Sequence, residues 1–226
     1  MWSSPIGGSG RELSPTARPR RSREEVERTK RRILEAALDL FNSHTYAEVS
    51  MRKVAARAGF SPAAIYNYYR NKDALYLDVL RSGFEMLHRS FLDGLDPEHP
   101  AAGLRHMAYR LYEFSRSHPT CYDLMFTLPV PKYLDYVGTD MEATAFDEKT
   151  VAVANFHLAE DVIRAGVLKG EFKQDLDPAR AALTLLAGAH GVISLARSGV
   201  LAELGLEDEA AYAAVMEQLL RQLSAE

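Results

Sequence analysis

Residues 50–72 gather side chains whose chemistry suits contact with phosphate oxygens. This stretch holds three tyrosines within four residues, together with serines, lysines and arginines. Hydroxyl and cationic groups bind the phosphates of nucleic acids, and small side chains let a helix approach base edges closely. The candidate contact residues are Ser50, Arg52, Lys53, Ser61, Pro62, Ala63, Tyr66, Asn67, Tyr68 and Lys72. Their types and spacing predict binding to double-stranded DNA.

The net charge favours the same interpretation once it is divided along the chain. Residues 1–75 contain 14 Lys and Arg against 8 Asp and Glu, whereas residues 76–226 contain 13 against 23. The total of −4 therefore combines a basic N-terminal part with an acidic remainder. Because affinity for a polyanion comes from local basic surface, we expect DNA to meet only the N-terminal part.

Short helices must position these side chains. Apolar residues at helical spacing predict a first helix from residue 23 to about residue 43. Ser50 is a suitable N-cap for a second helix, which Gly59 ends. Ser61, followed by a proline, then starts a third helix that runs to about Tyr69. Two helices joined by a glycine-containing turn form a helix-turn-helix.

Residues 1–22 are rich in Gly, Ser, Pro and Arg and have no periodicity, so we expect a disordered tail. Two interpretations of this tail stay open: an untethered terminus, and a basic arm that touches DNA. The arm would consist of Arg18, Arg20, Arg21 and Arg23.

The segment from Thr29 to Leu77 resembles the DNA-binding domain of TetR/AcrR-type transcriptional regulators. The resemblance rests on "ILEAALDLF", "VSMRKVAARAGFS", "AAIYNYY" and "NKDAL", in this order and at the expected spacing. It implies phosphate contacts from Ser50, Tyr66 and Lys72. It also implies that Arg52 reads a guanine in some members of the family.

Within this resemblance, Asn67 faces the DNA groove and Tyr68 or Tyr69 packs the helix onto the body. Three positions depart from the family pattern: Thr45 replaces a common glycine, Lys53 a common aspartate, and Tyr69 a common phenylalanine. None of these changes removes a contact group.

Three of these residues have a plainer interpretation. Tyr66 and Tyr69 would be ordinary core aromatics, because Ile65 and Tyr69 share a helix face. Arg52 would be a solvated charge.

The rest of the chain also reads as helical. Further helices are expected at residues 72–92, 104–117, 119–127, 146–168, 178–198 and 208–223. No alternating run bounded by hairpin turns predicts a strand. We therefore expect an all-α fold, in which a three-helix DNA-binding head with a helix-turn-helix spans residues 23–70. A helical ligand-binding and dimerisation domain would span residues 71–226.

Aromatic and methionine residues at helical spacing in the acidic part suggest a pocket for an apolar or aromatic effector, although such residues are also common in plain cores. The candidate pocket residues are Phe84, Met107, Leu111, Phe114, Met125, Phe126, Met141, Phe156 and His157.

The stretches "YEFSRSHPTCYDLMF" and "AGAHGVISLARSG" resemble the ligand-binding domain of TetR-type regulators named for a Trp-His-Gly signature. His190 and Gly191 are present, while Leu186 stands where the tryptophan would be. The resemblance implies a homodimer in which the last two long helices pair with their symmetry mates. Candidates for the second layer of that interface are Ala210, Ala214, Leu219 and Leu220. The small residues of 178–196 allow close helix approach, and they would also suit a core helix.

A metal site is the alternative use of His157, Asp161 and His190. We favour core histidines for His157 and His190, because no HExxH pattern or dense acid cluster accompanies them. No nucleophile, base and orienting group form a set, so we expect no enzyme and no cofactor.

The chain is expected to be cytoplasmic. It has one cysteine and no secretory signal, and its apolar runs are shorter than the roughly 20 residues that cross a bilayer, so no membrane partner is expected either.

We therefore expect a ligand-responsive, dimeric repressor that binds a palindromic operator and is released by a small effector. The alternative is a structural DNA-binding protein of the same fold without an effector. Thermal stabilisation by apolar compounds would separate the two.

Overall fold

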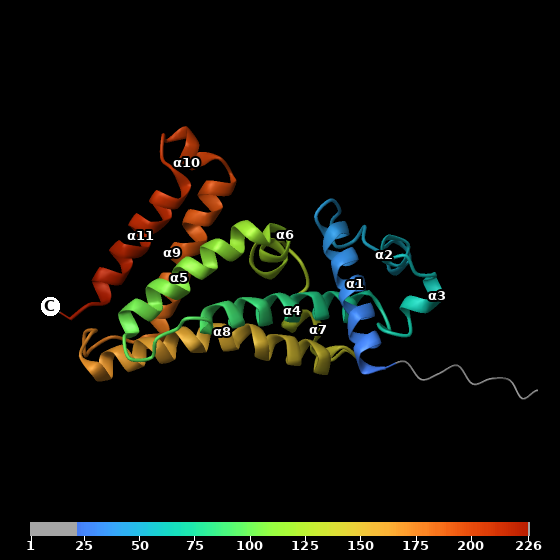
Figure 1. The fold of residues 1–226 in the computed structure, drawn as a ribbon, viewed down its shortest axis with the longest axis horizontal. Helices are drawn as coiled ribbons and strands as arrows, with labels where there is room; N and C mark the ends of the chain where they lie inside the picture. Colours follow the sequence, from blue (N-terminus) through green and yellow to red (C-terminus); the bar gives the residue numbers. More distant parts are fainter. Residues whose placement is uncertain (1–21, 226) are drawn as a thin grey trace, which may run out of the picture.

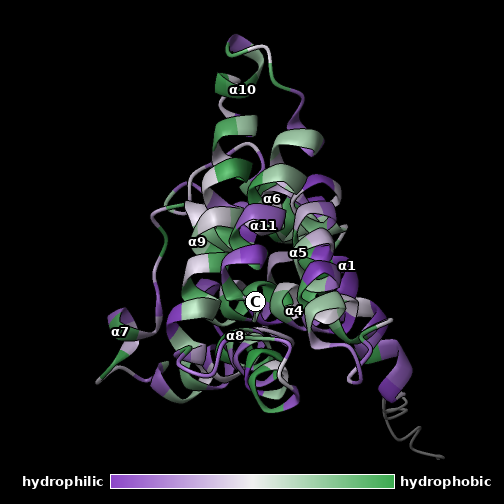
Figure 2. Ribbon diagram, turned by 90° about the vertical axis from the view of Figure 1, so that its left-hand side faces the viewer, coloured by the Kyte–Doolittle hydropathy of each residue, from purple (hydrophilic) through white to green (hydrophobic). Residues whose placement is uncertain are grey.

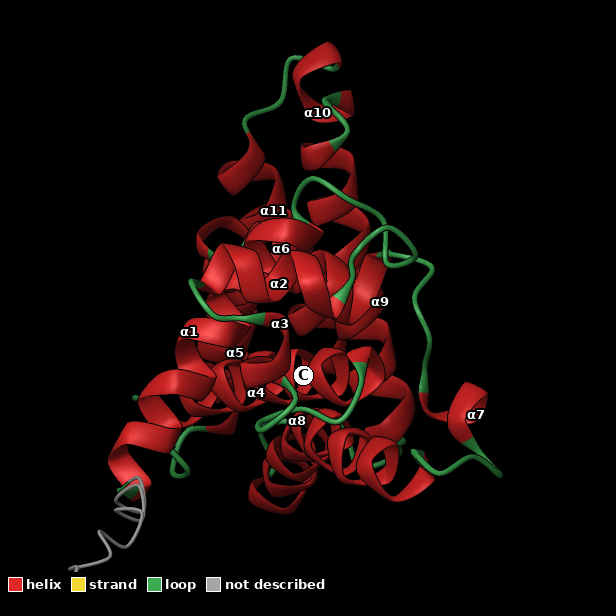
Figure 3. Ribbon diagram, turned by 90° about the vertical axis from the view of Figure 1, so that its right-hand side faces the viewer, coloured by secondary structure: helices red, strands yellow, loops and turns green. Residues whose placement is uncertain are grey.

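The structure, a computed structural model, describes residues 22–225. The expected tail and basic arm lie outside the described residues, except for Ser22 and Arg23. Over the described residues the chain folds as helices, with one isolated β-bridge and no named strand (Figure 3). A small head lies at one end of the molecule and a larger helical body at the other (Figure 1).

The head consists of α1 (Arg23–Phe41), α2 (Met51–Ala58) and α3 (Pro62–Ile65). Ser22 and Glu25 form a reciprocal capping box that fixes the start of α1. Ile33, Val54 and Ile65, one from each helix, have no exposed area and form the centre of the head.

Helix α4 (Lys72–Leu92) runs from the head into the body and contacts both α1 and α8. The boundary expected at residues 70/71 therefore falls just before the helix that both parts of the chain share.

The body continues through α5, α6 and a π-helical turn, and then through five more helices. Their bounds are α5 (Pro100–Ser117), α6 (Pro119–Tyr122), η1 (Asp123–Thr127), α7 (Tyr133–Tyr136), α8 (Glu142–Lys169), α9 (Pro178–Arg197), α10 (Val200–Glu203) and α11 (Asp208–Leu223). Helices α4 and α8 lie side by side along the length of the molecule, and α9 and α11 pair at the end away from the head (Figure 1).

The long helices match the sequence prediction, and their ends differ. Helix α5 begins at Pro100 instead of residue 104, because proline is well suited to a first helical turn. Helix α8 begins at Glu142 instead of residue 146. The one-turn helices α7 and α10 were not predicted, because four residues carry too little periodicity. Helix α3 ends at Ile65, and residues 66–68 continue as turns.

The end of the chain is tied to the loop after α8. The amide of Ala225 donates to the Glu171 carbonyl at 3.0 Å, and the Lys173 amide donates to the Leu223 carbonyl at 3.0 Å. Between these bonds, Phe172 is 1% exposed and lies directly against Gly166. A side chain at position 166 would overlap the Phe172 ring, so this glycine makes the packing of the loop on α8 possible.

Helix α9 is long and apolar enough to cross a bilayer by length and composition alone, and 33% of its most apolar window is buried. Figure 2 shows it mostly in green and white. This is weak support for a membrane span, because α9 packs against α5, α8 and α11 as one helix of a bundle.

Two of the expected interface residues are used inside the protomer. Leu219 packs against Gly188 of α9, and Leu220 is 4% exposed. Their side chains lie on the inner side of α11, which turns Ala210 and Ala214 outward. The expectation that Leu220 faces a partner is therefore wrong, because its side chain is buried, whereas the expectation for the half-buried Leu219 stays a prediction.

Replacing Gly166 with alanine should lower the free energy of unfolding by about 1–3 kcal/mol, because the new methyl group collides with the Phe172 ring. Chemical denaturation followed by circular dichroism measures this loss. In a Gly166→Ala/Phe172→Leu double variant, the loss should be smaller than the sum of the two single losses, since the narrower side chain relieves the collision. Strictly additive losses would contradict the proposed contact.

Candidate nucleic-acid interface and buried cavity

Most of the predicted contact residues lie on the outer surface of the head. Eight of them are exposed: Ser50, Arg52, Lys53, Ser61, Pro62, Ala63, Tyr66 and Asn67. They come from α2, from α3 and from the turn after α3, which face the viewer in Figure 3. Tyr68 and Lys72 are half-buried at the edge of this surface.

Capping bonds fix the starts of α2 and α3. The Ser50 hydroxyl accepts from the Lys53 amide at 3.3 Å, and the Ser61 hydroxyl accepts from the Ala64 amide at 3.2 Å. Gly59 adopts a left-handed conformation with φ of 74°, which turns the chain sharply between the two helices. A hydroxyl that accepts a capping bond still has a proton to donate to a phosphate.

Two tyrosines of the "YNYY" stretch differ sharply in their surroundings. The side chain of Tyr66 is 55% exposed, so it is not a core aromatic. Tyr69 is 4% exposed and donates its hydroxyl proton to Asp78 of α4 at 2.7 Å. Burial and this hydrogen bond raise the pKa of Tyr69 well above its ordinary value. Tyr69 therefore attaches the turn to the body, and Tyr66 faces solvent.

Lys72 and Asp73 connect the start of α4 to the head. The Lys72 amine donates to the Tyr46 carbonyl at 2.9 Å and lies 4.1 Å from the centre of the Tyr46 ring. The Tyr46 hydroxyl donates to Asp73, which also accepts from Tyr136 of α7 at 3.5 Å. Lys72 is thus partly engaged in the fold, and it keeps further N–H protons for a phosphate.

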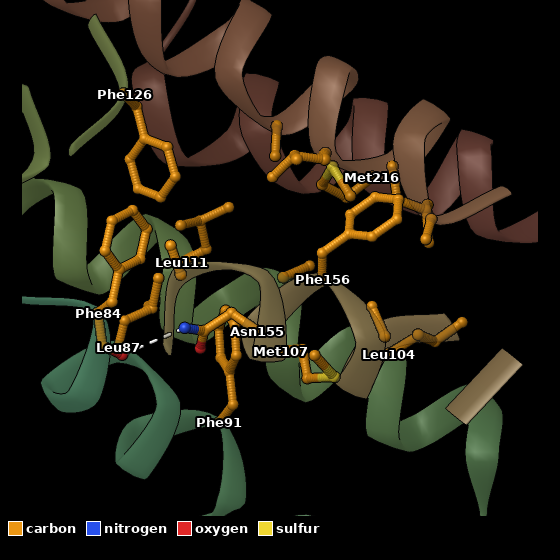
Figure 4. A pocket seen from close by; sticks show the side chains of 17 residues that line it. Phe84, Leu87, Phe91, Leu104, Met107, Leu111, Phe126, Asn155, Phe156 and Met216 are labelled. Carbon is orange, nitrogen blue, oxygen red and sulfur yellow. Dashed lines mark hydrogen bonds between the residues drawn. The ribbon is translucent and has the colours of Figure 1, made fainter. Parts of the chain in front are cut away.

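A cavity of about 110 Å³ lies in the body between α4, α5, η1, α8, α9 and α11. Its walls are almost entirely apolar (Figure 4). The lining residues are Phe84, Leu87, Phe91, Leu104, Met107, Ala108, Leu111, Phe126, Ala152, Asn155, Phe156, Ala159, Ala182, Leu185, Leu186, Ala189 and Met216. An apolar cavity enclosed by several helices is the usual kind of site for a small ligand.

Among the described residues that line this wall, the single polar side chain is that of Asn155 of α8, which is 8% exposed. Its Nδ2 donates to the Phe84 carbonyl of α4 at 3.2 Å and to the Val151 carbonyl of its own helix at 3.2 Å. Its Oδ1 is buried and has no hydrogen-bond partner within residues 22–225. Figure 4 shows the amide between Leu87, Phe91 and Met107.

Family models match both parts of the chain. The model for the bacterial regulatory proteins of the tetR family matches residues 33–79, and the model for the tetracyclin repressor-like C-terminal domain matches residues 104–223. The chain belongs to the TetR family.

Curated relatives of this family are transcriptional regulators. The HTH-type transcriptional regulator RutR of Escherichia coli K12 is 28% identical over 136 residues, which cover 58% of this chain and 63% of RutR. The HTH-type transcriptional repressor SCO4008 of Streptomyces coelicolor is 33% identical over 102 residues, 45% of this chain and 50% of that repressor. The chain thus matches less than two thirds of the length of these relatives.

Solved structures of the TetR family share the fold. The regulator PfmR of Thermus thermophilus superimposes with a TM-score of 0.66 at 20% identity, covering 86% of this chain and all of that chain. The division into an N-terminal helix-turn-helix head and a helical C-terminal domain is therefore the family fold.

Five of the nine predicted pocket residues of this TetR-family body line the cavity, and they come from four different elements. These are Phe84, Met107, Leu111, Phe126 and Phe156. Phe84 and Phe126 meet edge to face, with ring centres 5.5 Å apart, at one end of the cavity.

The other four predicted residues lie outside the cavity wall, each for a geometric reason. Phe114 is one turn too far along α5 and stacks on His118. Met125 and His157 each neighbour a lining phenylalanine, and adjacent helical residues point about 100° apart. Met125 packs on Cys121, whereas His157 is exposed and pairs with Glu160 at 2.6 Å. Met141 lies against Arg70 and Asn71 near the head.

Sequence reasoning missed the α9 wall of the cavity and, apart from Phe156, the α8 wall, although a signal was present. Positions 152, 155, 156 and 159 of α8, and positions 182, 185, 186 and 189 of α9, follow the i, i+3, i+4, i+7 spacing of one helix face. Asn155 is a polar residue inside such an apolar stripe, and this pattern indicates a position with a structural or ligand-binding role.

The histidines that the sequence analysis singled out have different surroundings. Among the described residues no group of three His, Cys, Asp or Glu side chains could hold a metal ion. His190 is half-buried, is hydrogen bonded to the Tyr122 hydroxyl, and lies 4.6 Å from the centre of the Phe126 ring. Burial lowers the pKa of His190 and favours the neutral ring. The core interpretation fits His190 and is wrong for His157, which faces solvent.

A buried carboxyl group lies on α8, near Lys132. Glu148 of α8 is 6% exposed, and burial raises its pKa to about 7, an effect that the nearby Lys132 partly offsets. The Lys132 amine donates to the Leu124 carbonyl at 3.2 Å and to the Met125 carbonyl at 3.1 Å, and it thereby attaches this segment to η1.

Glu148 should make the protein less stable as the pH rises from about 4.5 to about 7. In this range the unfolded chain releases the Glu148 proton while the folded chain retains it, because the folded pKa is the higher one. Glutamine has no proton to release, so Glu148→Gln does not lose stability in this way. The free energy of unfolding of Glu148→Gln relative to wild type should therefore grow by up to about 3 kcal/mol as the pH rises, and it should level off above pH 7. Denaturant unfolding between pH 4 and pH 8 measures the difference. Asp147→Asn, the exposed neighbour, is the control; two curves that stay parallel for Glu148→Gln and wild type would refute the assignment.

Proposed function

We propose that this chain is a ligand-responsive repressor that binds a palindromic operator as a homodimer and is released by a small apolar or aromatic effector. The observation that carries the proposal is the combination, on one long helix, of a basic head and an apolar cavity. Helix α4 holds Lys72 at the head and Phe84 in the cavity wall, about 18 Å further along the helix.

The exposed surface of α2 and α3 supports DNA binding. Arg52 is exposed and makes no ion pair or hydrogen bond with the described residues, which suits a side chain that reads a base edge. Ser50, Tyr66 and Lys72 would bind phosphates and set the position of the head on the duplex. Such binding would take place in the bacterial cytoplasm, without a cofactor.

The outer face of α9 supports a dimer. Leu183 and Leu195 are 57% and 43% exposed, and Ala187 and Gly191 lie between them at a spacing of one turn each. An apolar, small-residue face of this kind suits close packing against a second copy. Ala210 and Ala214 of α11 extend it. Two heads would then present their recognition helices about 34 Å apart, one turn of DNA.

Effector release would act through α4. A ligand that fills the cavity presses on Phe84, Leu87 and Phe91, three residues on one side of α4. Because α4 is continuous to Lys72 and Asp73, a tilt at the cavity changes the position of the head. The ligand shifts the population only if it binds the tilted conformer more tightly. The alternative, a structural DNA-binding protein, would bind DNA and ignore every apolar compound.

Duplexes selected from a random pool by the wild-type protein should share a palindrome, because two heads read it symmetrically. Leu183→Arg places a charge in the proposed interface, and the variant should sediment as a monomer and enrich only half-sites. Leu168→Arg is a matched control, since Leu168 is 83% exposed on α8, outside this face. A dimer that survives Leu183→Arg, or a pool without any enriched sequence, would refute the proposal.

On the selected operator, Arg52→Ala should lose about 1–3 kcal/mol of binding free energy and relax the preference at one base pair. Tyr66→Phe removes only an exposed hydroxyl, so it should weaken binding to all duplexes alike, by about 1 kcal/mol. Fluorescence anisotropy with single-base operator variants separates the two patterns. Identical sequence profiles for the two variants would contradict the division between base and phosphate contacts.

A further inference from the structure

Asn155 presents an unused hydrogen-bond acceptor in an otherwise apolar wall. The residue is 92% buried, since its exposed fraction is 8%, and Oδ1 is buried without a hydrogen-bond partner. Buried amide oxygens in folded proteins are nearly always paired, because removing such a group from water without a partner is costly. The Oδ1 atom therefore needs a hydrogen-bond donor, and the described part of the chain provides none.

The orientation of the amide is determined by its neighbours. Nδ2 faces two carbonyl oxygens, those of Phe84 and Val151, each at 3.2 Å. The reversed amide would place Oδ1 against both oxygens, so the nitrogen must occupy this side. The donor half of the amide thus joins α8 to α4, and the acceptor half has no structural use.

The lining of the cavity defines the rest of the ligand. None of its described lining residues is ionisable, so a carboxylate or an ammonium group would lose water without gaining a counter-charge. At about 110 Å³ the cavity is somewhat smaller than an apolar cavity of about 150 Å³ that accepts benzene. A bicyclic ligand therefore enters only if flexible side chains of the wall, such as that of Met107, move aside.

We propose that the effector is a neutral, mainly apolar molecule with one N–H or O–H donor, which bonds to Oδ1 of Asn155. This inference rests on the proposed function, because it assigns the chemistry of the effector to the same cavity. Asn155 then reports ligand binding directly to α4, since the same amide is bonded to the Phe84 carbonyl. A compound that offers only an acceptor at this point meets Oδ1 without a hydrogen bond and binds less well.

Three bicyclic compounds of nearly the same shape test the proposal: indole, which has an N–H donor, indene, which has none, and benzofuran, which has an oxygen instead. Isothermal titration calorimetry with the full-length protein should show indole binding roughly 3- to 10-fold more tightly than indene or benzofuran. This comparison needs no variant. Equal affinities for all three would overturn the Asn155 inference and leave an apolar effector cavity standing.

Variants locate the preference at Asn155. Asn155→Leu keeps the side-chain size and removes both the acceptor and the donor that bonds to α4, so both affinities can change, but indole should lose its advantage over indene. Phe156→Leu is the matched control on the same helix face: it should weaken all three compounds by a similar factor and keep the preference for indole. Should indole still be preferred by folded Asn155→Leu, checked by circular dichroism, the inference is wrong. If none of the three binds the wild type, the cavity as an effector site fails as well.

Discussion

Helix α4 is the element on which the arrangement of this protein depends. Its first turn is held to the head by the bonds from Lys72 to the Tyr46 carbonyl and from Tyr46 to Asp73, and Asp78 on its second turn accepts from Tyr69. Further along, its residues form one wall of the cavity. A helix of 21 residues is about 31 Å long. Because the helix is continuous, a displacement of that wall would also move the end of α4 that is bonded to the head.

Helix α8 packs along α4 and helps to hold it in position. Asn155 bonds to the Phe84 carbonyl, and Phe156 on the next position faces the same cavity. Toward the head, Glu148 of α8 is buried near Lys132, and Tyr136 of α7 donates to Asp73 of α4. The bond from Asn155 to the Phe84 carbonyl is directional, so it helps to fix the register of α4 on α8, where apolar side chains alone would allow sliding.

The sequence predicted the fold well where local signals are strong. Ser50, Gly59 and Ser61 mark the helix-turn-helix, and their caps are present as expected. The exposed state of Tyr66 and the burial of Tyr69 depend on which side of a short turn faces α4, and periodicity over four residues cannot decide this. Met141 and Phe114 were expected in the pocket by residue type, but distance along the helix axis excludes them. Asn155 was not predicted, because a polar side chain does not fit the aromatic and methionine pattern that indicates an apolar pocket.

The pairing of residues 171–173 with residues 223–225 affects how the protein can be handled. Since Ala225 and Leu223 are bonded to the loop after α8, the carboxyl end is held at the side of the molecule opposite the head (Figure 1). A bulky group joined to the chain close to residue 225 would therefore lie away from the head and next to these hydrogen bonds. A short spacer would therefore be needed before any fusion, so that the added chain does not pull this strand-like pairing apart.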